Sequence, residues 1–289
     1  MKKNLIIRTI TGIAFVATIV GCMLLHPAAY AIIFAIIAGL TTWEFCTLVN
    51  NHLHCQVNRL ITTVASVYLF GAILAFNANI CGSEIFIPYL ITQVYMLIAE
   101  LYLKDNNVIM NWAFTMMAQL YIALPFALLN TLSFFSVDYG YADHRVFYDP
   151  TLILSVFIFI WSGDSAAYCF GTAFGRHRLF QRISPKKSWE GFIGAVGMAI
   201  AVSQVIAIYE PTFSANNVAN HMAWAGLAVI VTGFGTWGDL VESLFKRKLN
   251  IKDSGNILPG HGGMLDRFDS SLLAIPMAVV YVYTIKEIL

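Results

Sequence analysis

The sequence predicts an all-α protein that crosses a membrane about nine times, and three observations support this fold class. Of its 289 residues, 58% are apolar and only 11% are charged, whereas an ordinary soluble domain carries about 25% charged residues. The apolar residues gather into runs of about 20, the length at which a helix spans a hydrocarbon core. Lysine and arginine gather between alternate runs, as expected when one side of the membrane is the cytoplasm.

Nine apolar runs are long enough to be transmembrane helices. The first run follows two lysines and resembles a signal peptide, but apolar residues continue past Cys22 and a second run starts after Pro27. We therefore expect a retained first helix. Pro88 and Pro125 fall inside two runs, where proline kinks a helix or marks its end. The predicted spans cover residues 8–25, 28–48, 60–78, 85–103, 110–134, 151–174, 190–208, 222–243 and 271–287.

The charges indicate the orientation of these spans. With nine spans, all of the 17 lysines and arginines except Arg145 and Lys286 lie on the same side as the N-terminus. The positive-inside rule makes that side the cytoplasm. One span more or fewer would separate the two basic loops, residues 175–190 and 244–270, or turn both outward.

The domain organisation follows from the positions of these loops. We assign residues 1–140 to N-terminal transmembrane helices, about five spans, and residues 141–289 to a C-terminal catalytic region that carries both basic loops. Every loop is too short to form a soluble domain with its own core. The five cysteines show no paired spacing, so neither a disulfide framework nor a zinc site is indicated.

The first basic loop ends in the run SPKKSWE. Lys186 and Lys187 stand near Ser184 and near the backbone N–H groups of the next helix start, an arrangement that binds anions. The alternative is a topology signal that contacts anionic lipid headgroups. Asp164 lies inside the preceding apolar span, where an ionisable side chain is costly and indicates a functional site. Its alternative role is hydrogen bonding within helix packing.

One pair of carboxylates precedes the second basic loop, and another lies near its end. Asp239 follows three glycines at the cytoplasmic end of the eighth span, and Glu242 shares its helical face. Asp266 and Asp269 are also three residues apart. Carboxylates from two neighbouring segments can converge on a hard cation such as Mg²⁺, which also binds substrate phosphates. Salt bridges between these aspartates and nearby basic residues are the alternative. His261, in a Gly-His-Gly-Gly run, is a general base, a phosphate donor or a turn residue.

The polar segment from Ser243 to Asp269 reads SLFKRKLNIKDSGNILPGHGGMLDRFD. Its SxFKR, KDxG and LPxHGGMxDRFD elements, at this spacing, resemble the signature of the phosphatidate cytidylyltransferases, the CDP-diacylglycerol synthases. The run DSAAYxxG at 164–171 and the run SPKKSWEG at 184–191 are similar to two further stretches of that family. The resemblance therefore covers the C-terminal half of the chain.

This resemblance implies transfer of a cytidylyl group from CTP to phosphatidic acid, which gives CDP-diacylglycerol and pyrophosphate in phospholipid biosynthesis. Both substrates are anionic, so cations must offset their repulsion. The resemblance implies Mg²⁺, with a second cation, on Asp239 and Asp266, and Asp269 is a further candidate ligand. The expected catalytic group also includes Lys252, Arg267 and His261, and the expected substrate-binding group is Lys246, Arg247, Ser184, Lys186, Lys187 and Asp164.

The expected partners are the two substrates, the bilayer and, from the known members of the family, a second copy of the chain; no nucleic acid is expected. The site would face the cytoplasm from the cell membrane. Gly191, Gly194 and Gly197 are expected to line a helix-packing seam, within or between subunits.

Other functions remain open from the sequence. The acceptor could instead be an isoprenoid-alcohol phosphate, or the protein could be a CTP-dependent lipid kinase. The CDP-alcohol phosphotransferases are disfavoured because their DGxxAR…GxxxD…D pattern is absent. An anion transporter needs access to both membrane faces, whereas the candidate groups gather near one.

Overall fold

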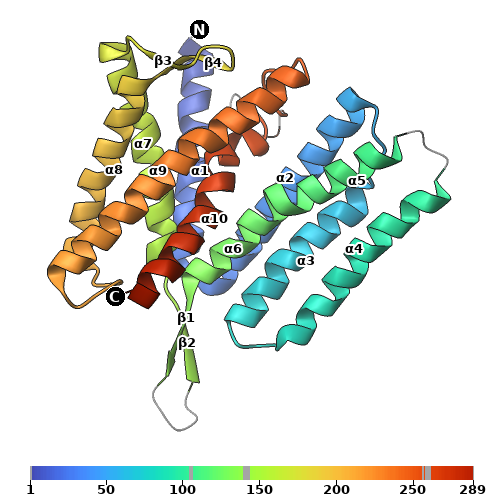
Figure 1. The fold of residues 1–289 in the computed structure, drawn as a ribbon, viewed down its shortest axis with the longest axis horizontal. Coiled ribbons are helices and arrows are strands. Elements are labelled where there is room, and N and C mark those ends of the chain that lie inside the picture. Colours follow the sequence, from blue (N-terminus) through green and yellow to red (C-terminus); the bar gives the residue numbers. More distant parts are fainter. Residues whose placement is uncertain (1, 104–106, 139–143, 256, 258–261, 289) are drawn as a thin grey trace. The chain divides into compact units, whose positions relative to one another are not determined.

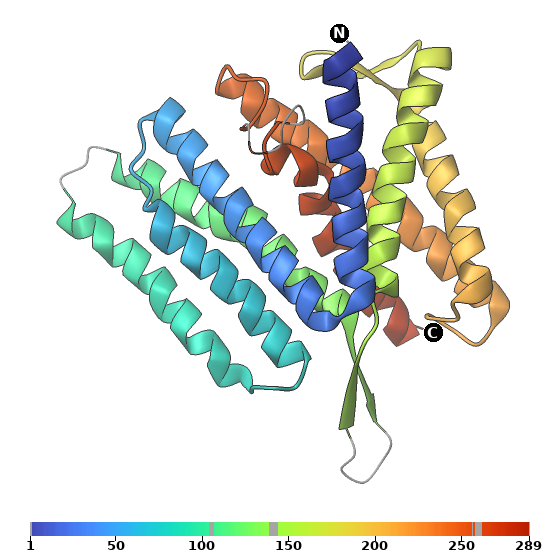
Figure 2. The same cartoon turned by 180° about the vertical axis from the view of Figure 1, so that it is seen from behind.

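The computed structural model describes residues 2–103, 107–138, 144–255, 257 and 262–288, and long helices make up most of it (Figures 1 and 2). The chain forms two compact units. The first comprises Met1–Pro150 and Leu249–Phe268, and the second comprises Thr151–Lys248 and Asp269–Leu289. The division concerns packing, and the boundary at residue 140 between N-terminal helices and catalytic region stays a prediction.

The first unit consists mainly of helices, in which α3 packs against α2 and α6. Its elements are α1 (Lys2–Leu25), α2 (Pro27–Leu53), α3 (Arg59–Asn77), the 3₁₀ turn η1 (Ser83–Phe86), α4 (Ile87–Ala99), the 3₁₀ turn η2 (Glu100–Tyr102), α5 (Val108–Met117), the π-helical stretch η3 (Ala118–Ala123), α6 (Leu124–Ser133), β1 (Phe134–Asp138) and β2 (His144–Tyr148). Buried polar pairs support the packing: the Tyr30 hydroxyl donates to Asn130 Oδ1 at 3.1 Å, and the Thr42 hydroxyl donates to Ser66 at 2.8 Å.

The two prolines act as the sequence predicts. Pro88 lies in the first turn of α4, where its missing N–H group leaves no helical hydrogen bond unmade. Pro125 lies just after η3, so the π-helical stretch absorbs the interruption inside one long helical segment.

The second unit contains α7 (Thr151–Phe174), β3 (Arg178–Phe180), β4 (Ser184–Ser188), α8 (Trp189–Tyr209), α9 (Asn217–Lys248) and α10 (Leu265–Ile288) from Asp269 onward. Within this unit, the β3–β4 hairpin and the C-terminal end of α9 lie opposite the α8–α9 connection (Figures 1 and 2).

The expected glycine seam lies between α7 and α8. A Cβ atom on Gly191 would lie 2.8 Å from the Ala167 carbonyl oxygen, and one on Gly194 would lie 2.5 Å from the Phe170 ring. Only glycine therefore permits this close approach of the two helices. At Gly197 an added Cβ would meet no atom within 4 Å, so this glycine is not part of the contact between α7 and α8, and its place in a seam between subunits stays a prediction.

The helices confirm an all-α polytopic membrane protein. In the described residues, eight helical segments are long and apolar enough to cross a membrane, and Ile10–Leu25 is a shorter apolar helix. The count of nine spans therefore stays a prediction. The structure also adds two antiparallel hairpins, β1–β2 and β3–β4, where the sequence suggested only loops.

Candidate functional site

A pocket of ≈ 270 Å³ lies in the second unit, among α7, the β3–β4 hairpin, α8 and α9. Four residues predicted from the sequence line it together: Asp164, Lys186, Lys187 and Asp239. The structure thus joins the first basic loop to the carboxylates of two helices.

An ion pair between Lys187 and Asp239 forms one wall of this pocket. Lys187 Nζ lies 2.6 Å from Asp239 Oδ2, and the two side chains are 26% and 30% exposed. Lys187 also donates to the Thr236 carbonyl oxygen at 3.4 Å, and the Ser243 hydroxyl donates to Asp239 Oδ1 at 3.1 Å. Both side chains are mostly shielded from solvent, but the Lys187 ammonium group is still exposed enough for an anion in the pocket to bind it.

Two local features hold Lys187 in place. Ser188 is the N-cap of α8, because its side chain accepts from the Gly191 N–H group at 3.2 Å. Glu190 accepts from the backbone N–H groups of Arg176 and His177 at 3.2 Å, and His177 Nδ1 lies 2.6 Å from Glu190 Oε1. Both ends of the hairpin are therefore tied to the start of α8.

Close packing of α9 on α10 brings a second carboxylate toward Asp239. A Cβ on Gly238 would lie 2.6 Å from the Asp269 carbonyl oxygen, so glycine is required there. Asp269 interacts electrostatically with Asp239 and, more weakly, with Asp164, both repulsive, whereas Lys246 attracts it. This cluster of negative charge is a place where a bound cation would be favourable.

Lys246 itself lies against Glu242. Its Nζ is 2.5 Å from Glu242 Oε2, and the side chains are 14% and 0% exposed. Glu242, one turn before Lys246 on α9, therefore fixes the amino group of this predicted substrate-binding residue. Arg247 is exposed.

In the first unit, two described parts of the signature segment, Ser254 and residues 262–265, lie around Asp266, and we call them the turn. Asp266 Oδ2 accepts from the Ser254 N–H at 2.8 Å and from the Gly263 N–H at 2.9 Å. Gly262 has φ +86°, a left-handed conformation that favours glycine. The paired glycines thus serve the turn, whereas His261 lies outside the described residues. Lys252 and Arg267 are exposed.

The predicted site residues therefore fall into two groups. Asp164, Lys186, Lys187, Asp239 and Asp269 belong to the second unit, together with Lys246, Arg247 and Ser184, which begins β4. Asp266, Lys252 and Arg267 belong to the first unit. In the described residues, no three His, Cys, Asp or Glu side chains form a ready metal-binding group. Mg²⁺ often uses only one or two carboxylates together with substrate phosphates, so the two carboxylates Asp239 and Asp269 fit such an ion.

One residue of interest was absent from the sequence prediction. Glu44, in α2, accepts hydrogen bonds from the Met264 and Leu265 N–H groups and from the Ser254 hydroxyl. An acidic residue alone in an apolar run was the available signal.

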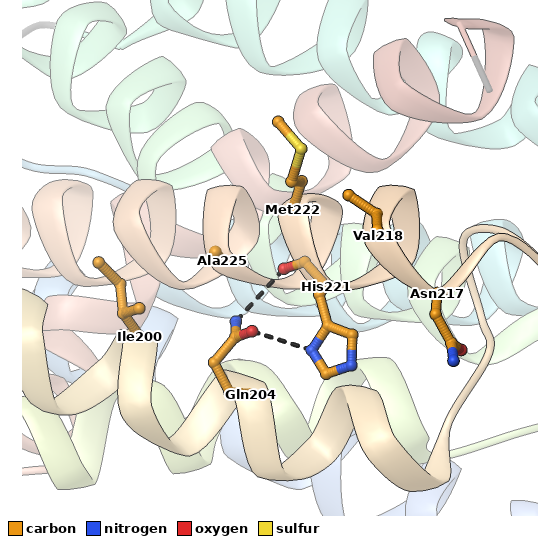
Figure 3. Close-up of a pocket in the computed structure, with 7 residues that line it drawn as sticks. All are labelled: Ile200, Gln204, Asn217, Val218, His221, Met222 and Ala225. Atoms are coloured by element: carbon orange, nitrogen blue, oxygen red, sulfur yellow. Dashed lines mark hydrogen bonds between the residues drawn. The ribbon is translucent and has the colours of Figure 1, made fainter.

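Another pocket of the second unit lies at the opposite ends of α8 and α9 (Figure 3). There His221 Nδ1 lies 2.9 Å from Gln204 Oε1, and Gln204 Nε2 donates to the His221 carbonyl oxygen at 3.3 Å. None of its seven lining residues is Lys, Arg, Asp or Glu. It lacks the cationic groups that a polyphosphate requires, so the pocket at Lys187 is the candidate site.

Comparison with known proteins identifies the family. Residues 6–285 match the model of the cytidylyltransferase family. The phosphatidate cytidylyltransferase of Staphylococcus aureus (strain COL) is 33% identical over 275 residues, which are 94% of this chain and 96% of that protein. The phosphatidate cytidylyltransferase of Haemophilus influenzae is 29% identical over 282 residues, 93% of this chain and 95% of that protein. The resemblance predicted from the C-terminal motif is confirmed over nearly the whole length, and the chain belongs to the cytidylyltransferase family.

Proposed function

We propose that this protein transfers the cytidylyl group of CTP to phosphatidic acid, giving CDP-diacylglycerol and pyrophosphate. The likeness to phosphatidate cytidylyltransferases over 94% of the chain carries this conclusion. A membrane-embedded helical fold and a pocket lined by both lysines and aspartates support it.

The chemistry needs charge and positioning more than a strong base. A lipid phosphate oxygen forms a bond to the α-phosphorus of CTP, and the bond from that phosphorus to the bridging oxygen of pyrophosphate breaks. The attacking phosphate is already ionised at neutral pH, so the barrier lies mainly in the repulsion between anions and in their alignment. Lys186 and Lys187 line the pocket, and they would hold phosphate oxygens and stabilise the charge on the departing pyrophosphate.

Mg²⁺ and a second cation are further parts of the proposal. Asp239 and Asp269 would hold Mg²⁺ from the second unit, and Asp266, from the first unit, is the partner that the family resemblance implies. Bound Mg²⁺ would supply positive charge to the phosphate oxygens. The mutual repulsion of Asp239 and Asp269 supports this assignment because a cation would relieve it.

The membrane arrangement is also proposed. We infer nine spans with the N-terminus and both basic loops in the cytoplasm, where the site would take CTP from solution and phosphatidic acid from the inner leaflet of the cell membrane. A homodimer is consistent with the open space at Gly197 on α8.

The deciding experiment uses purified protein with phosphatidic acid, Mg²⁺ and CTP labelled in its cytidine. We expect lipid-soluble label and release of pyrophosphate. A CTP-dependent lipid kinase would leave the cytidine label in water, and an isoprenoid-phosphate enzyme would label only that acceptor. Absence of label transfer to any lipid phosphate would overturn the proposed function.

Asp266→Asn tests the metal assignment. Asparagine keeps an oxygen that can accept from the Ser254 and Gly263 N–H groups, so the turn should persist and the protein should stay folded. It loses the negative charge that a cation needs, so turnover should be abolished. Substantial label transfer by a folded Asp266→Asn protein would contradict the assignment.

A further inference from the structure

Glu44 contacts the signature segment from the N-terminal half of the chain. It is the sole Asp, Glu, Lys or Arg of α2, and it is 6% exposed. Its carboxylate accepts from the Met264 N–H at 2.8 Å, from the Leu265 N–H at 3.3 Å and from the Ser254 hydroxyl. All four residues belong to the first unit.

These contacts place a negative charge at the start of α10. The first N–H groups of a helix have no partner within the helix, and they carry the positive end of its dipole. Glu44 satisfies two N–H groups at this position from a different helix. A buried carboxylate is tolerated only when it is well hydrogen-bonded. These contacts therefore satisfy both the Glu44 carboxylate of α2 and the N–H groups at the start of α10.

Ser254 connects Glu44 to the predicted metal ligand. Its hydroxyl donates to Glu44, and its backbone N–H donates to Asp266 Oδ2 at 2.8 Å. Asp266 also accepts from the Gly263 N–H, next to Met264, which donates to Glu44. A single serine thus separates the two carboxylates in the network.

At two glycines of the signature, a side chain would clash with Glu44. A Cβ on Gly263 would overlap Glu44 Oε1 and the Ser254 hydroxyl, and a Cβ on Gly255 would lie 2.9 Å from the Glu44 carboxyl carbon. Any larger residue at Gly263 would displace the carboxylate or the turn. The glycines of the signature therefore leave room for the side chain of Glu44, although Ser254 lies 210 residues after Glu44 in the sequence.

We propose that Glu44 is a positioning residue for the site, and that it holds Ser254 and the backbone of residues 263–265 so that the Asp266 carboxylate is presented in one orientation. The inference rests on the proposed function for its catalytic consequence, but the hydrogen-bond network itself does not. It assigns part of the active-site scaffold to the second helix, outside the C-terminal region in which the sequence placed all of the chemistry.

Glu44→Gln is the primary test, and Glu100→Gln is its matched control. Glutamine has nearly the same shape as glutamate. Its NH₂ group, however, is a donor, and it would face an N–H group from which the carboxylate accepted a hydrogen bond. Glu100 is also a buried carboxylate of the first unit, 7% exposed and hydrogen-bonded to Asn111 Nδ2 at 2.9 Å, away from the turn. Each protein is purified in detergent, and its thermal unfolding, its kcat and KM for CTP, its Mg²⁺ dependence and the amide hydrogen exchange of residues 249–268 are measured.

We expect Glu44→Gln to stay folded, to lose about 10–100-fold in kcat and to require more Mg²⁺, as for residues that orient metal ligands. Exchange of the 249–268 amides should accelerate. Glu100→Gln should match the wild type in kcat and in this exchange. Equal losses in both variants, in proportion to lowered stability, would mean that Glu44 only supports the fold and would overturn the proposal.

Ser254→Ala keeps the test decisive if Glu44→Gln does not fold. It removes one donor to Glu44 and preserves the N–H that donates to Asp266, so it should give a smaller fall in kcat with faster exchange. Unchanged kcat and unchanged exchange would refute positioning. If the wild type itself transfers no cytidylyl group, the proposed function fails, and the exchange measurements alone still decide whether Glu44 holds the turn.

Discussion

Lys187, from a strand, and Asp239, from a helix, form an ion pair in one wall of the pocket. Such a pair keeps a lysine pointed into a site before any substrate arrives, which reduces the ordering that binding requires. An incoming phosphate would compete with Asp239 for the ammonium group, while Asp239 would become available to a cation. Once the site is filled, Lys187 would bind a phosphate and Asp239 would bind a cation.

Replacing Lys187 with methionine tests this role. Methionine is close to the lysine stem in length but carries no charge, so Asp239 loses its partner and the phosphate loses a cation. We expect kcat/KM for CTP to fall about 100-fold or more, as when one stabilising group of a charged transition state is removed. Arg182→Gln, an exposed charge between β3 and β4 that does not line the pocket, should leave it unchanged. Wild-type activity in Lys187→Met would refute the role.

At the level of single residues, the sequence predicted several residues that line the pocket, but it did not predict Glu44. Asp164 and Asp239 were found because a charge in an apolar run, or beside glycines, has a visible cost. Lys187 was found because it stands beside a second lysine near the start of a helix. Glu44 has the same cost, but its donors lie in another part of the sequence, and a single sequence does not reveal such a distant pairing. The turn geometry of Gly262 likewise emerged only from the backbone.

Among the elements, the close approach of α9 and α10 depends on Gly238. Asp239 is its neighbour, so the same contact that packs the helices also sets the distance between two carboxylates. A methyl group there would press on the Asp269 carbonyl oxygen, which lies 2.6 Å from the added atom, and on that of Ser270, at 3.0 Å. Neither backbone atom can move without shifting α10.

Gly238→Ala should therefore destabilise the protein by about 1–3 kcal/mol, the usual cost of overpacking. Gly233→Ala is the matched control on the same helix, because its added methyl group would meet no atom within 4 Å. Alanine is favoured over glycine by about 1 kcal/mol in a helix, so this variant should be neutral or stabilised. Unfolding in detergent measures both variants, and similar shifts in the two would contradict the packing argument.

The β3–β4 hairpin is one of the two hairpins that the sequence did not predict. Its pairing is short, with Arg178 opposite Ser188 and Phe180 opposite Ser184, and it contains Pro185. Charged residues and a proline do not favour a strand, so the local signal indicated a loop. The hairpin is held instead by its ends, through Glu190 and the start of α8.

Glu190→Gln should loosen this hairpin. The glutamine side chain accepts less well from the Arg176 and His177 N–H groups, and it loses the charged interaction with His177. We expect faster tryptic cleavage after Arg178 and Arg182 in membranes, with lower activity at low CTP. The control is Glu210→Gln at the other end of α8, whose backbone oxygen, not its side chain, accepts from Trp224. Unchanged cleavage would mean that the hairpin does not depend on Glu190.

For the whole molecule, the positions of the long helices were predictable because a bilayer fixes their length and composition. The packing of the helices was not. The segment from Leu249 to Phe268 packs with residues of the first unit, although it lies between two helices of the second. Contacts between residues so distant in sequence have no local signature, so the sequence alone could not predict this packing.

The orientation of the chain can be tested with a native cysteine. Cys81 is exposed in the connection between α3 and η1. With the N-terminus in the cytoplasm it lies outside, whereas Arg182, three predicted spans later, lies inside. A protein that retains Cys81 alone should react with a membrane-impermeant maleimide in intact cells. Arg182→Cys in a cysteine-free chain should react only after permeabilisation, because the positive charge of its loop keeps it in the cytoplasm.

Both proteins must transfer label from CTP to phosphatidic acid, which shows that they are folded. The reverse pattern of labelling would place the basic loops and the site on the outer face, away from CTP, and would refute the proposed topology.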